Sequence, residues 1–218
     1  MRSHFAAFLS ALLVAVCSDA AIGSFAPEHP SPVVSFSEAD THALGRGLVR
    51  TGNAVVEGGT ASLTLPAHTF DGAEIRSVER FGYGVYEARM KTPRAPGTLS
   101  AFFLYEGGSD IADELDVELF NDGSRRVMFT TWVAGKTTHT ATLQLPFDPA
   151  DGFHDYRIEW SRDRVRFLVD GVVMQEWRDA LPANPMHVMA NTWWPTWISG
   201  PRPDTPQSLQ IDRIRAAL

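Results

Sequence analysis

Three carboxylates occupy alternate positions in the segment Glu114-Leu115-Asp116-Val117-Glu118, and apolar residues fill the positions between them. Successive side chains of a β-strand point to opposite faces. On such a strand the three acids would share one face, while Leu115 and Val117 would point into a core. Placing like charges side by side on one face of a sheet is destabilising. The segment therefore predicts a strand whose acidic face serves a chemical purpose.

Short alternating runs separated by turn residues make up most of the chain, and no long segment has helical periodicity. Candidate strands are residues 82–90, 99–105, 114–120, 126–133, 137–145, 155–161, 165–169, 172–177, 186–193 and 209–214. Hairpin or turn signals are Gly107-Gly108, Asn121-Asp122-Gly123 and Asp170-Gly171. Many strands joined by tight turns predict an all-β fold, an antiparallel β-sandwich of the jelly-roll type.

Length and charge restrict the possible function classes. A chain of 218 residues suits one large β-sandwich domain. A hydrophobic share of 44% and a charged share of 21% are typical of a globular protein. The net charge of −7 argues against a nucleic-acid partner, which requires clustered Lys and Arg, and against an anionic membrane surface.

Residues 1–20 have the pattern of a signal peptide. Arg2 supplies a positive start, an apolar run follows from Phe5 to Val16, and Ser18 and Ala20 are the small residues that a signal peptidase requires. The apolar run is too short to span a bilayer, which makes an uncleaved anchor the weaker alternative. Cleavage before Cys17, as in a lipoprotein, is weaker still because Val16 is bulky.

A secreted or periplasmic location follows from this reading. Residues 21–35 would form an exposed lead-in rich in Pro and Ser, and residues 36–218 would form the catalytic domain. Since the one cysteine lies inside the signal segment, the mature chain would contain no disulfide. Its stability would depend on the core.

Paired carboxylates are the groups that glycoside hydrolysis requires. One attacks or stabilises the anomeric carbon, and a protonated partner donates to the leaving oxygen. Asp116 would separate these roles, because a neighbouring like charge raises the pKa of one carboxyl. On a flat strand the Cα atoms of Glu114 and Glu118 would lie roughly 13 Å apart, whereas a retaining pair has its carboxyls about 5–5.5 Å apart. A hydrolase built on this strand therefore requires a concave sheet.

Aromatic side chains accompany the acidic strand. They lie on the candidate strands before and after it and near the end of the chain, where an asparagine joins them: Phe103, Tyr105, Trp132, Trp193, Trp194, Trp197 and Asn191. Sugar rings stack their apolar faces on aromatic residues and bind polar partners at their rims. The alternative is a solvated acidic face on an edge strand with the aromatic residues in the core. The coincidence of both features favours a sugar-binding cleft.

In order and spacing these motifs resemble family-16 glycoside hydrolases, which include bacterial lichenases and xyloglucan-modifying enzymes. The similar segments are residues 72–77, 83–91, 102–105, 114–118 and 160–171, and the likeness covers about residues 70 to 215. It implies a concave, concanavalin-like jelly roll and a retaining mechanism. Because no residue is inserted among the three acids, the chain resembles the lichenase-like branch more than the many laminarinase-like members that have such an insertion.

The resemblance also implies residue roles. Carried over by position, Glu114 would be the nucleophile, Asp116 its helper and Glu118 the acid/base. The residues that would line the sugar cleft are Glu74, Arg76, Phe103, Tyr105, Asn191 and Trp193. Trp132, on the strand after the acids, is a further candidate for substrate binding.

Three departures from the lichenase pattern concern the substrate and the disulfide. Ala112 stands where those enzymes have a tryptophan, Thr130 where they have an asparagine, and Gly72 where they have a disulfide partner. The segment Asn191-Thr192-Trp193-Trp194-Pro195 also differs. A bacterial exopolysaccharide or another β-glucan is therefore as plausible a substrate as mixed-linkage cereal glucan.

No pattern in the chain requires a cofactor or metal. The histidines lack metal-ligand spacing, and His154 and His187 are interpreted as structural. Gly82 and Gly84 do not form a nucleotide loop, because no helix follows them. Asp212 matches a position where related enzymes hold a structural calcium, but a surface salt link is favoured, since calcium takes about 6–8 oxygen ligands.

The sequence thus predicts a secreted, endo-acting glycoside hydrolase that cleaves a β-linked polysaccharide with retention. A transglycosylase would use the same residues and pass the glycosyl unit to another sugar. A non-catalytic lectin on the same fold would keep the aromatic residues but would not need all three acids. The expected partner is the polysaccharide, without nucleic acid or membrane, and the expected state is a monomer.

Overall fold

The computed structural model describes residues 35–107 and 112–218. The expected signal peptide, nearly all of the lead-in and the second glycine of the Gly107-Gly108 turn lie outside the described residues and stay predictions. The elements found in the described ranges are all β-strands. In the same ranges no helix is long and apolar enough to cross a membrane.

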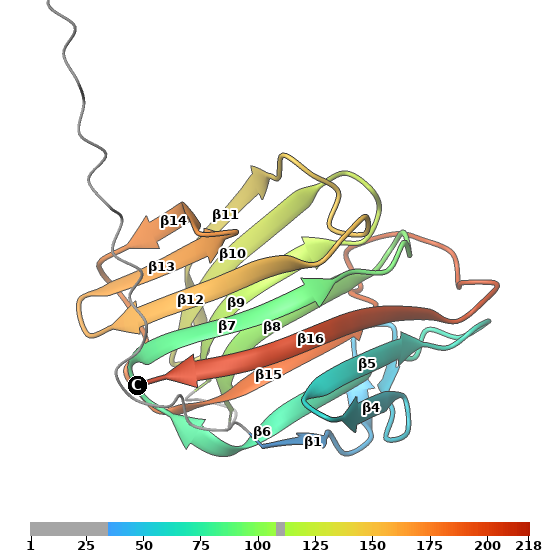
Figure 1. Ribbon diagram of the computed structural model, residues 1–218, viewed down its shortest axis with the longest axis horizontal. Helices are drawn as coiled ribbons and strands as arrows, with labels where there is room; N and C mark the ends of the chain where they lie inside the picture. The colour runs from blue at the N-terminus through green and yellow to red at the C-terminus, as the bar shows by residue number, and fades with distance from the viewer. Residues whose placement is uncertain (1–34, 108–111) are drawn as a thin grey trace, which may run out of the picture.

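Two seven-stranded antiparallel sheets pack face to face (Figure 1). The first sheet, in spatial order, contains β1 (Phe36–Glu38), β6 (Ala73–Phe81), β15 (Met186–Trp193), β8 (Leu99–Glu106), β9 (Asp113–Phe120), β10 (Arg126–Val133) and β11 (Lys136–Gln144). The second contains β14 (Val172–Trp177), β13 (Arg164–Val169), β12 (His154–Ser161), β7 (Gly84–Lys91), β16 (Gln207–Ala217), β5 (Thr60–Leu65) and β4 (Ala54–Glu57). A small hairpin sheet pairs β2 (His42–Leu44) with β3 (Gly47–Val49). The predicted all-β antiparallel sandwich is confirmed.

The strands predicted from residue 82 onward are all present, as β7 to β16. The strands before that residue, β1 to β6, were not predicted, although β5 alternates polar and apolar residues in the run Thr-Ala-Ser-Leu-Thr-Leu. The first three are only three residues long, too short for a periodic pattern. β6 begins with the alternating run Ala73-Glu74-Ile75-Arg76, in which the polar Glu74 is buried along with its apolar neighbours.

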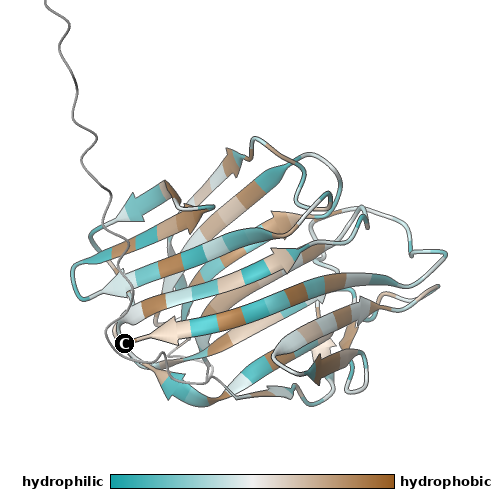
Figure 2. Cartoon of the chain, viewed as in Figure 1, coloured by the Kyte–Doolittle hydropathy of each residue, from teal (hydrophilic) through white to brown (hydrophobic). Residues whose placement is uncertain are grey.

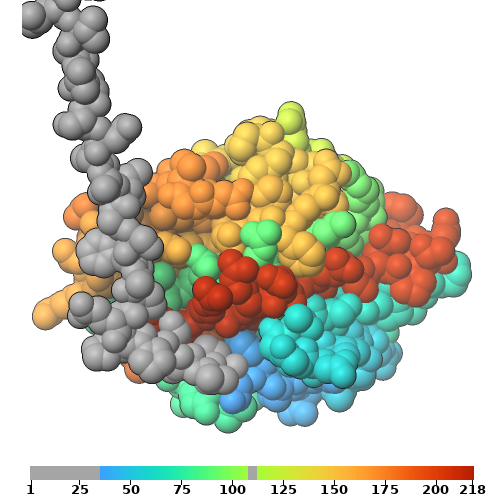
Figure 3. Space-filling view, in the orientation of Figure 1, coloured from blue at the N-terminus to red at the C-terminus, as the bar shows by residue number. Residues whose placement is uncertain are grey.

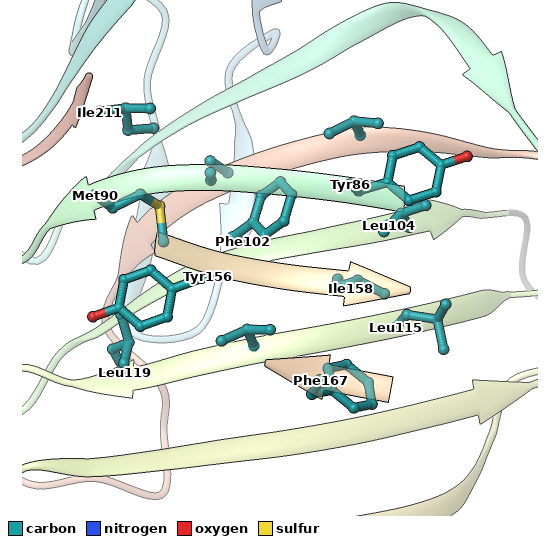
Figure 4. Close-up of a cluster of buried hydrophobic side chains, with 14 of the residues drawn as sticks. Tyr86, Met90, Phe102, Leu104, Leu115, Leu119, Tyr156, Ile158, Phe167 and Ile211 are labelled. Atoms are coloured by element: carbon teal, nitrogen blue, oxygen red, sulfur yellow. The ribbon is translucent and has the colours of Figure 1, made fainter. Parts of the chain in front are cut away.

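The inner faces of the two sheets form one apolar core (Figure 4). Leu115 and Val117 of the acidic strand are fully buried in it, as the alternation predicts. Across the sandwich lie Tyr156 and Ile158 of β12 and Phe167 of β13, which are buried as well. Full burial of such a side chain contributes about 1.5–3 kcal/mol. Figure 2 shows the same alternation of hydrophobic and hydrophilic residues along the strands of the second sheet.

Ion pairs cover the outer face of the second sheet, which faces the viewer in Figures 1 and 3. Arg157 Nη2 lies 2.6 Å from Glu87 Oε2, and Arg213 Nη2 lies 2.7 Å from Asp155 Oδ1. Because these groups are partly exposed, each pair contributes about 0–1 kcal/mol. The carboxylates on this surface are therefore solvated and neutralised by arginines, unlike the acids on the opposite face of the molecule.

Asp212, the position considered for calcium, lies on this ion-paired face. Its carboxylate lies 3.1 Å from Arg213 Nη1 and 3.7 Å from Arg89 Nε. This geometry agrees with a surface salt link. Among residues 35–107 and 112–218, no group of three or more His, Cys, Asp or Glu side chains is arranged to hold a metal ion.

The entry to β6 depends on a close backbone approach at Gly72. A Cβ atom at this position would lie 2.4 Å from the carbonyl oxygen of Thr192. We expect Gly72→Ala to lower the free energy of unfolding by about 1–3 kcal/mol, because the two strands must separate to admit the methyl group. Chemical denaturation measures this loss.

Gly82→Ala is the matched control for that substitution. No atom lies within 4 Å of a Cβ placed at Gly82, so its unfolding free energy should stay within about 0.5 kcal/mol of wild type. Equal effects at the two glycines would contradict the close-approach interpretation.

Candidate active site

The register of the first sheet places the three acids together on its outer face. Strand β9 pairs with β8 and with β10 without a register shift, so strict alternation holds through the acidic segment. Each acid lies between one residue of β8 and one of β10, in the rows Tyr105-Glu114-Trp132, Phe103-Asp116-Thr130 and Ala101-Glu118-Met128. The chemical and aromatic residues therefore share one surface.

Two further strands extend these rows on the other side of β8. Asn191 of β15 pairs with Ala101 of β8 and with Glu74 of β6. In the next row Met189 lies between Phe103 and Arg76. The surface around the acids thus combines the polar Glu74 and Asn191 in one row with the apolar Met189 and Phe103 in the next, which suits a sugar ring with a polar rim and an apolar face.

This surface is the floor of an open cleft with a volume of about 690 Å³. Such a volume is within the usual range for small-ligand sites, about 300–1,000 Å³. All but one of the predicted site residues line it: Glu74, Phe103, Tyr105, Glu114, Asp116, Glu118, Trp132, Asn191 and Trp193. Residues that were not predicted as site residues but also line it are His42, Leu44, Ala101, Met128, Thr130, Thr137, Thr140, Met189 and Trp197.

Arg76 and Trp194 have other environments. Arg76 lies on the same strand face as Glu74 but is exposed and is not among the residues that line the cleft. Trp194 is 1% exposed and packs against Phe70 and Leu65 in a separate small core. Of the adjacent tryptophans, only Trp193 therefore faces the cleft.

The hairpin β2–β3 forms a wall of the cleft that the sequence did not indicate. Its residues His42 and Leu44 line the cleft. The turn packs against the end of β15, where Arg46 N–H donates to the carbonyl of Trp194 over 2.8 Å. Gly45, with φ of 60°, is needed in this turn because a Cβ there would lie 2.0 Å from the same carbonyl oxygen.

Burial raises the pKa of both outer acids. The pKa of Glu114 is raised to about 7 by burial and by the negative charge of Glu74, against a hydrogen bond from Asp116 that lowers it. The pKa of Glu118 is also raised to about 7, by burial and by the charge of Glu114. Since a charge on Glu114 opposes ionisation of Glu118, the two carboxyls resist being ionised together near neutral pH.

Asp116 is the most deeply buried of the three acids, and its pKa is raised well above the ordinary value. Burial is the largest cause, followed by the charges of Glu114 and Glu118 and by the hydrogen bond to Glu114, while a hydrogen bond from Trp132 opposes them. A protonated Asp116 donates to the Glu114 carboxylate. This arrangement favours ionisation of Glu114 and leaves the remaining proton on Glu118.

At the β6 side of the cleft, Glu74 and Asn191 form a buried polar pair. Asn191 Nδ2 donates to Glu74 Oε2 over 3.1 Å, and His42 Nε2 lies 3.9 Å from Glu74 Oε1. The pKa of Glu74 is raised overall, because the effect of burial exceeds the opposing effects of Asn191, His42 and Arg76. Asn191 Oδ1 is buried without a hydrogen-bond partner, an arrangement that suits a donor from a ligand hydroxyl.

Asp113, the first residue of β9, anchors the start of the acidic strand by hydrogen bonds. It is buried and accepts hydrogen bonds from the Ala134 N–H over 3.0 Å and from Asn184 Nδ2 over 2.9 Å. These donors belong to the turn after β10 and to the segment before β15. Asp113 thus ties together three of the elements that carry cleft residues.

Comparison with known proteins identifies the family. The sequence model of the family described as "Glycosyl hydrolases family 16" matches residues 46–214. The chain belongs to glycosyl hydrolase family 16. The resemblance seen in the motifs is thereby confirmed.

Two relatives show how far this family-16 chain is similar to characterised members. A beta-glucanase of Bacillus subtilis is 36% identical over 135 residues, which cover 61% of this chain and 56% of the relative. The endo-1,3-1,4-beta-glycanase ExoK of Rhizobium meliloti is 30% identical over 174 residues, covering 76% of this chain and 65% of the relative. The chain thus matches less than two thirds of the length of either relative.

A solved structure supports the family-16 fold. The beta-glucanase of Bacillus licheniformis superimposes with a TM-score of 0.76 and 27% identity, covering 84% of this chain and 92% of that one. The predicted jelly roll is therefore confirmed, as is membership of a glycoside hydrolase family.

The raised pKa of Glu118 has a consequence for stability. Between pH 4.5 and about 7 the folded protein binds a proton that the unfolded chain releases, so the free energy of unfolding falls as pH rises. We expect Glu118→Gln to melt a few degrees above wild type at pH 8, and at the same temperature as wild type at pH 4. Thermal unfolding at both pH values measures this difference.

Glu57, exposed at the end of β4, is the control position. Glu57→Gln should leave the melting temperature unchanged at both pH values. A Glu118→Gln effect of equal size at pH 4 and pH 8 would show that the stabilisation does not come from the carboxyl's ionisation.

Proposed function

We propose that this protein is an endo-acting glycoside hydrolase that cleaves β-linked polysaccharide with retention of anomeric configuration. The observation that carries the proposal is the grouping of Glu114, Asp116 and Glu118 on the floor of one open cleft. The pKa of each outer acid is raised to about 7, and Asp116 is hydrogen-bonded to Glu114. A carboxylate beside a carboxylic acid is the chemical requirement of glycoside hydrolysis.

In the first step Glu118 donates its proton to the glycosidic oxygen while the Glu114 carboxylate attacks the anomeric carbon. The bond from that carbon to the leaving oxygen breaks, and a covalent glycosyl-enzyme forms. The hydrogen-bond pattern supports these roles, because Asp116 stabilises the ionised form of Glu114.

In the second step Glu118, now ionised, accepts a proton from water as the water oxygen attacks the anomeric carbon. The bond to Glu114 breaks and the carboxylate is regenerated. Loss of negative charge on Glu114 during the covalent stage lowers the pKa of Glu118, since the charge of Glu114 is one cause of its elevation. Glu118 can therefore act as acid first and as base afterwards.

The substrate class is a β-glucan or a related β-linked chain. Two relatives carry the names beta-glucanase and endo-1,3-1,4-beta-glycanase, and the cleft combines apolar residues with the polar pair Glu74 and Asn191. Its open form suits cleavage within a chain. Secretion through the N-terminal segment, a monomeric state and independence of a cofactor belong to the same proposal.

Glu114→Gln and Glu118→Gln test the catalytic roles. Each substitution keeps the shape of the side chain and removes its ionisation, so we expect turnover to fall on the order of 10³-fold or more. Release of new reducing ends from soluble β-1,3-1,4-glucan, β-1,3-glucan, β-galactan and a bacterial exopolysaccharide measures turnover. Glu57→Gln is the control and should keep wild-type activity.

Near wild-type turnover in either glutamine variant would refute the role of that residue. If wild type releases no reducing ends from any polysaccharide, hydrolysis itself is refuted, and binding without turnover would indicate a lectin. Products longer than the starting material would indicate a transglycosylase. NMR of the first-formed anomer tests retention, and an inverted product would contradict the covalent intermediate.

A further inference from the structure

Trp197 is an exposed tryptophan on the wall of the cleft. It is 57% exposed and lines the cleft together with Trp193. Trp160 and Trp194, by contrast, are only 2% and 1% exposed. Leaving an indole in contact with water forgoes the free energy of burying a large apolar surface. An exposed indole beside a sugar cleft therefore suggests that a ligand covers it.

The indole is held by an aromatic neighbour at the end of the acidic strand β9. Trp197 packs in a T-shaped arrangement against Phe120, with ring centroids 6.0 Å apart. The guanidinium of Arg126 lies 3.9 Å from the centre of the Phe120 ring and also pairs with Asp122. Phe120 is thus fixed between two neighbours and supports Trp197.

The loop that carries Trp197 is anchored to the body of the protein. Arg46 donates to the carbonyl oxygens of Gly200 and Gly97 over 3.1 and 3.2 Å. A Cβ at Gly200 would lie 2.0 Å from the carbonyl oxygen of Pro96, so the two loop backbones are in close contact. This anchoring pre-organises the indole, which reduces the entropy lost when a ligand binds.

Trp197 also has a defined place relative to the acids. Phe120 follows Glu118 by two residues on the same strand face, which corresponds to about 7 Å along β9. The indole therefore lies beyond Glu118, at the end of the acidic row away from Glu114. A sugar ring there would be displaced from the bond that breaks.

We propose that Trp197 is a stacking platform for a pyranose ring of the β-linked chain, at a subsite beyond Glu118 and away from the scissile bond. The proposal rests on the function proposed above and adds a subsite to it. The Phe120 contact and the anchored loop hold the indole, and the hydrophobic face of the sugar covers it. Binding energy from this subsite is remote from the chemistry and acts on affinity for long chains.

The direct test is the affinity of Trp197→Ala and Trp197→Phe, each in the non-hydrolysing Glu118→Gln background. Affinity electrophoresis in gels that contain soluble β-1,3-1,4-glucan, β-1,3-glucan or β-galactan measures the dissociation constant. For a polysaccharide that retards the parent, we expect Trp197→Ala to bind about tenfold more weakly, from the loss of one aromatic contact. Trp197→Phe should keep most of the affinity.

Tyr83→Ala is the control, because Tyr83 is an exposed aromatic residue that packs against Trp160 and does not line the cleft. Its affinity should equal that of the parent. In the active background, Trp197→Ala should raise KM and leave kcat close to wild type.

The outcomes separate the platform from the hydrolase. Unchanged affinity in Trp197→Ala, or an equal loss in Tyr83→Ala, overturns the platform while hydrolysis by wild type still stands. Polysaccharide binding that depends on Trp197 without any turnover supports the platform and refutes the hydrolase. Absence of retardation of the parent by all three polysaccharides overturns the platform as well.

Discussion

The cleft places four carboxyl groups near one another without a permanent positive charge among them. Glu74, Glu114, Asp116 and Glu118 all line it, while none of the described residues that line it is lysine or arginine. Burying an unpaired charge is costly, so burial raises the pKa of a carboxyl group and favours its neutral form. Protons therefore act as the counter-ions of this site. The raised pKa values of the acidic row follow from that constraint, and so does the division between proton donor and nucleophile in the proposed mechanism.

The opposite surface of the protein shows that this arrangement is local. On the outer face of the second sheet, carboxylates such as Glu87 and Asp155 lie within 2.7 Å of arginine nitrogens. Carboxylates are therefore paired with arginines on that face, whereas no arginine or lysine lines the cleft among the described residues. The apolar core between the sheets offsets the cost of the unpaired acids. In this respect the site is destabilised relative to the scaffold, as expected where charge is held for catalysis.

The acidic row could be predicted because it depends on a single strand. Alternation places Glu114, Asp116 and Glu118 on one face whichever strands lie beside them, and the buried Leu115 and Val117 confirm it. Trp193 ends strand β15 and lines the cleft, whereas Trp194 follows the strand and is buried in a separate small core. The walls of the cleft, by contrast, are positioned by hydrogen bonds between segments far apart in the sequence. The hairpin with His42 takes its position from the Trp194 carbonyl, and the loop with Trp197 takes its position from Arg46. Contacts between segments about 150 residues apart leave no local pattern to read.

Chemistry and specificity are therefore encoded at different levels of this fold. In the proposed mechanism the reaction depends on a row of side chains whose spacing is set by the strand geometry and not by the rest of the chain. In the proposed hydrolase the choice of polysaccharide would depend on the residues that border that row: His42 and Leu44 on one wall, and Trp193 and Trp197 near the end beyond Glu118. The hairpin with His42 and the loop with Trp197 are held by a few hydrogen bonds, while Trp193 ends strand β15. Small changes in them would move a sugar-binding contact without disturbing the paired strands beneath, which explains how one β-sandwich can keep its mechanism while its substrate varies.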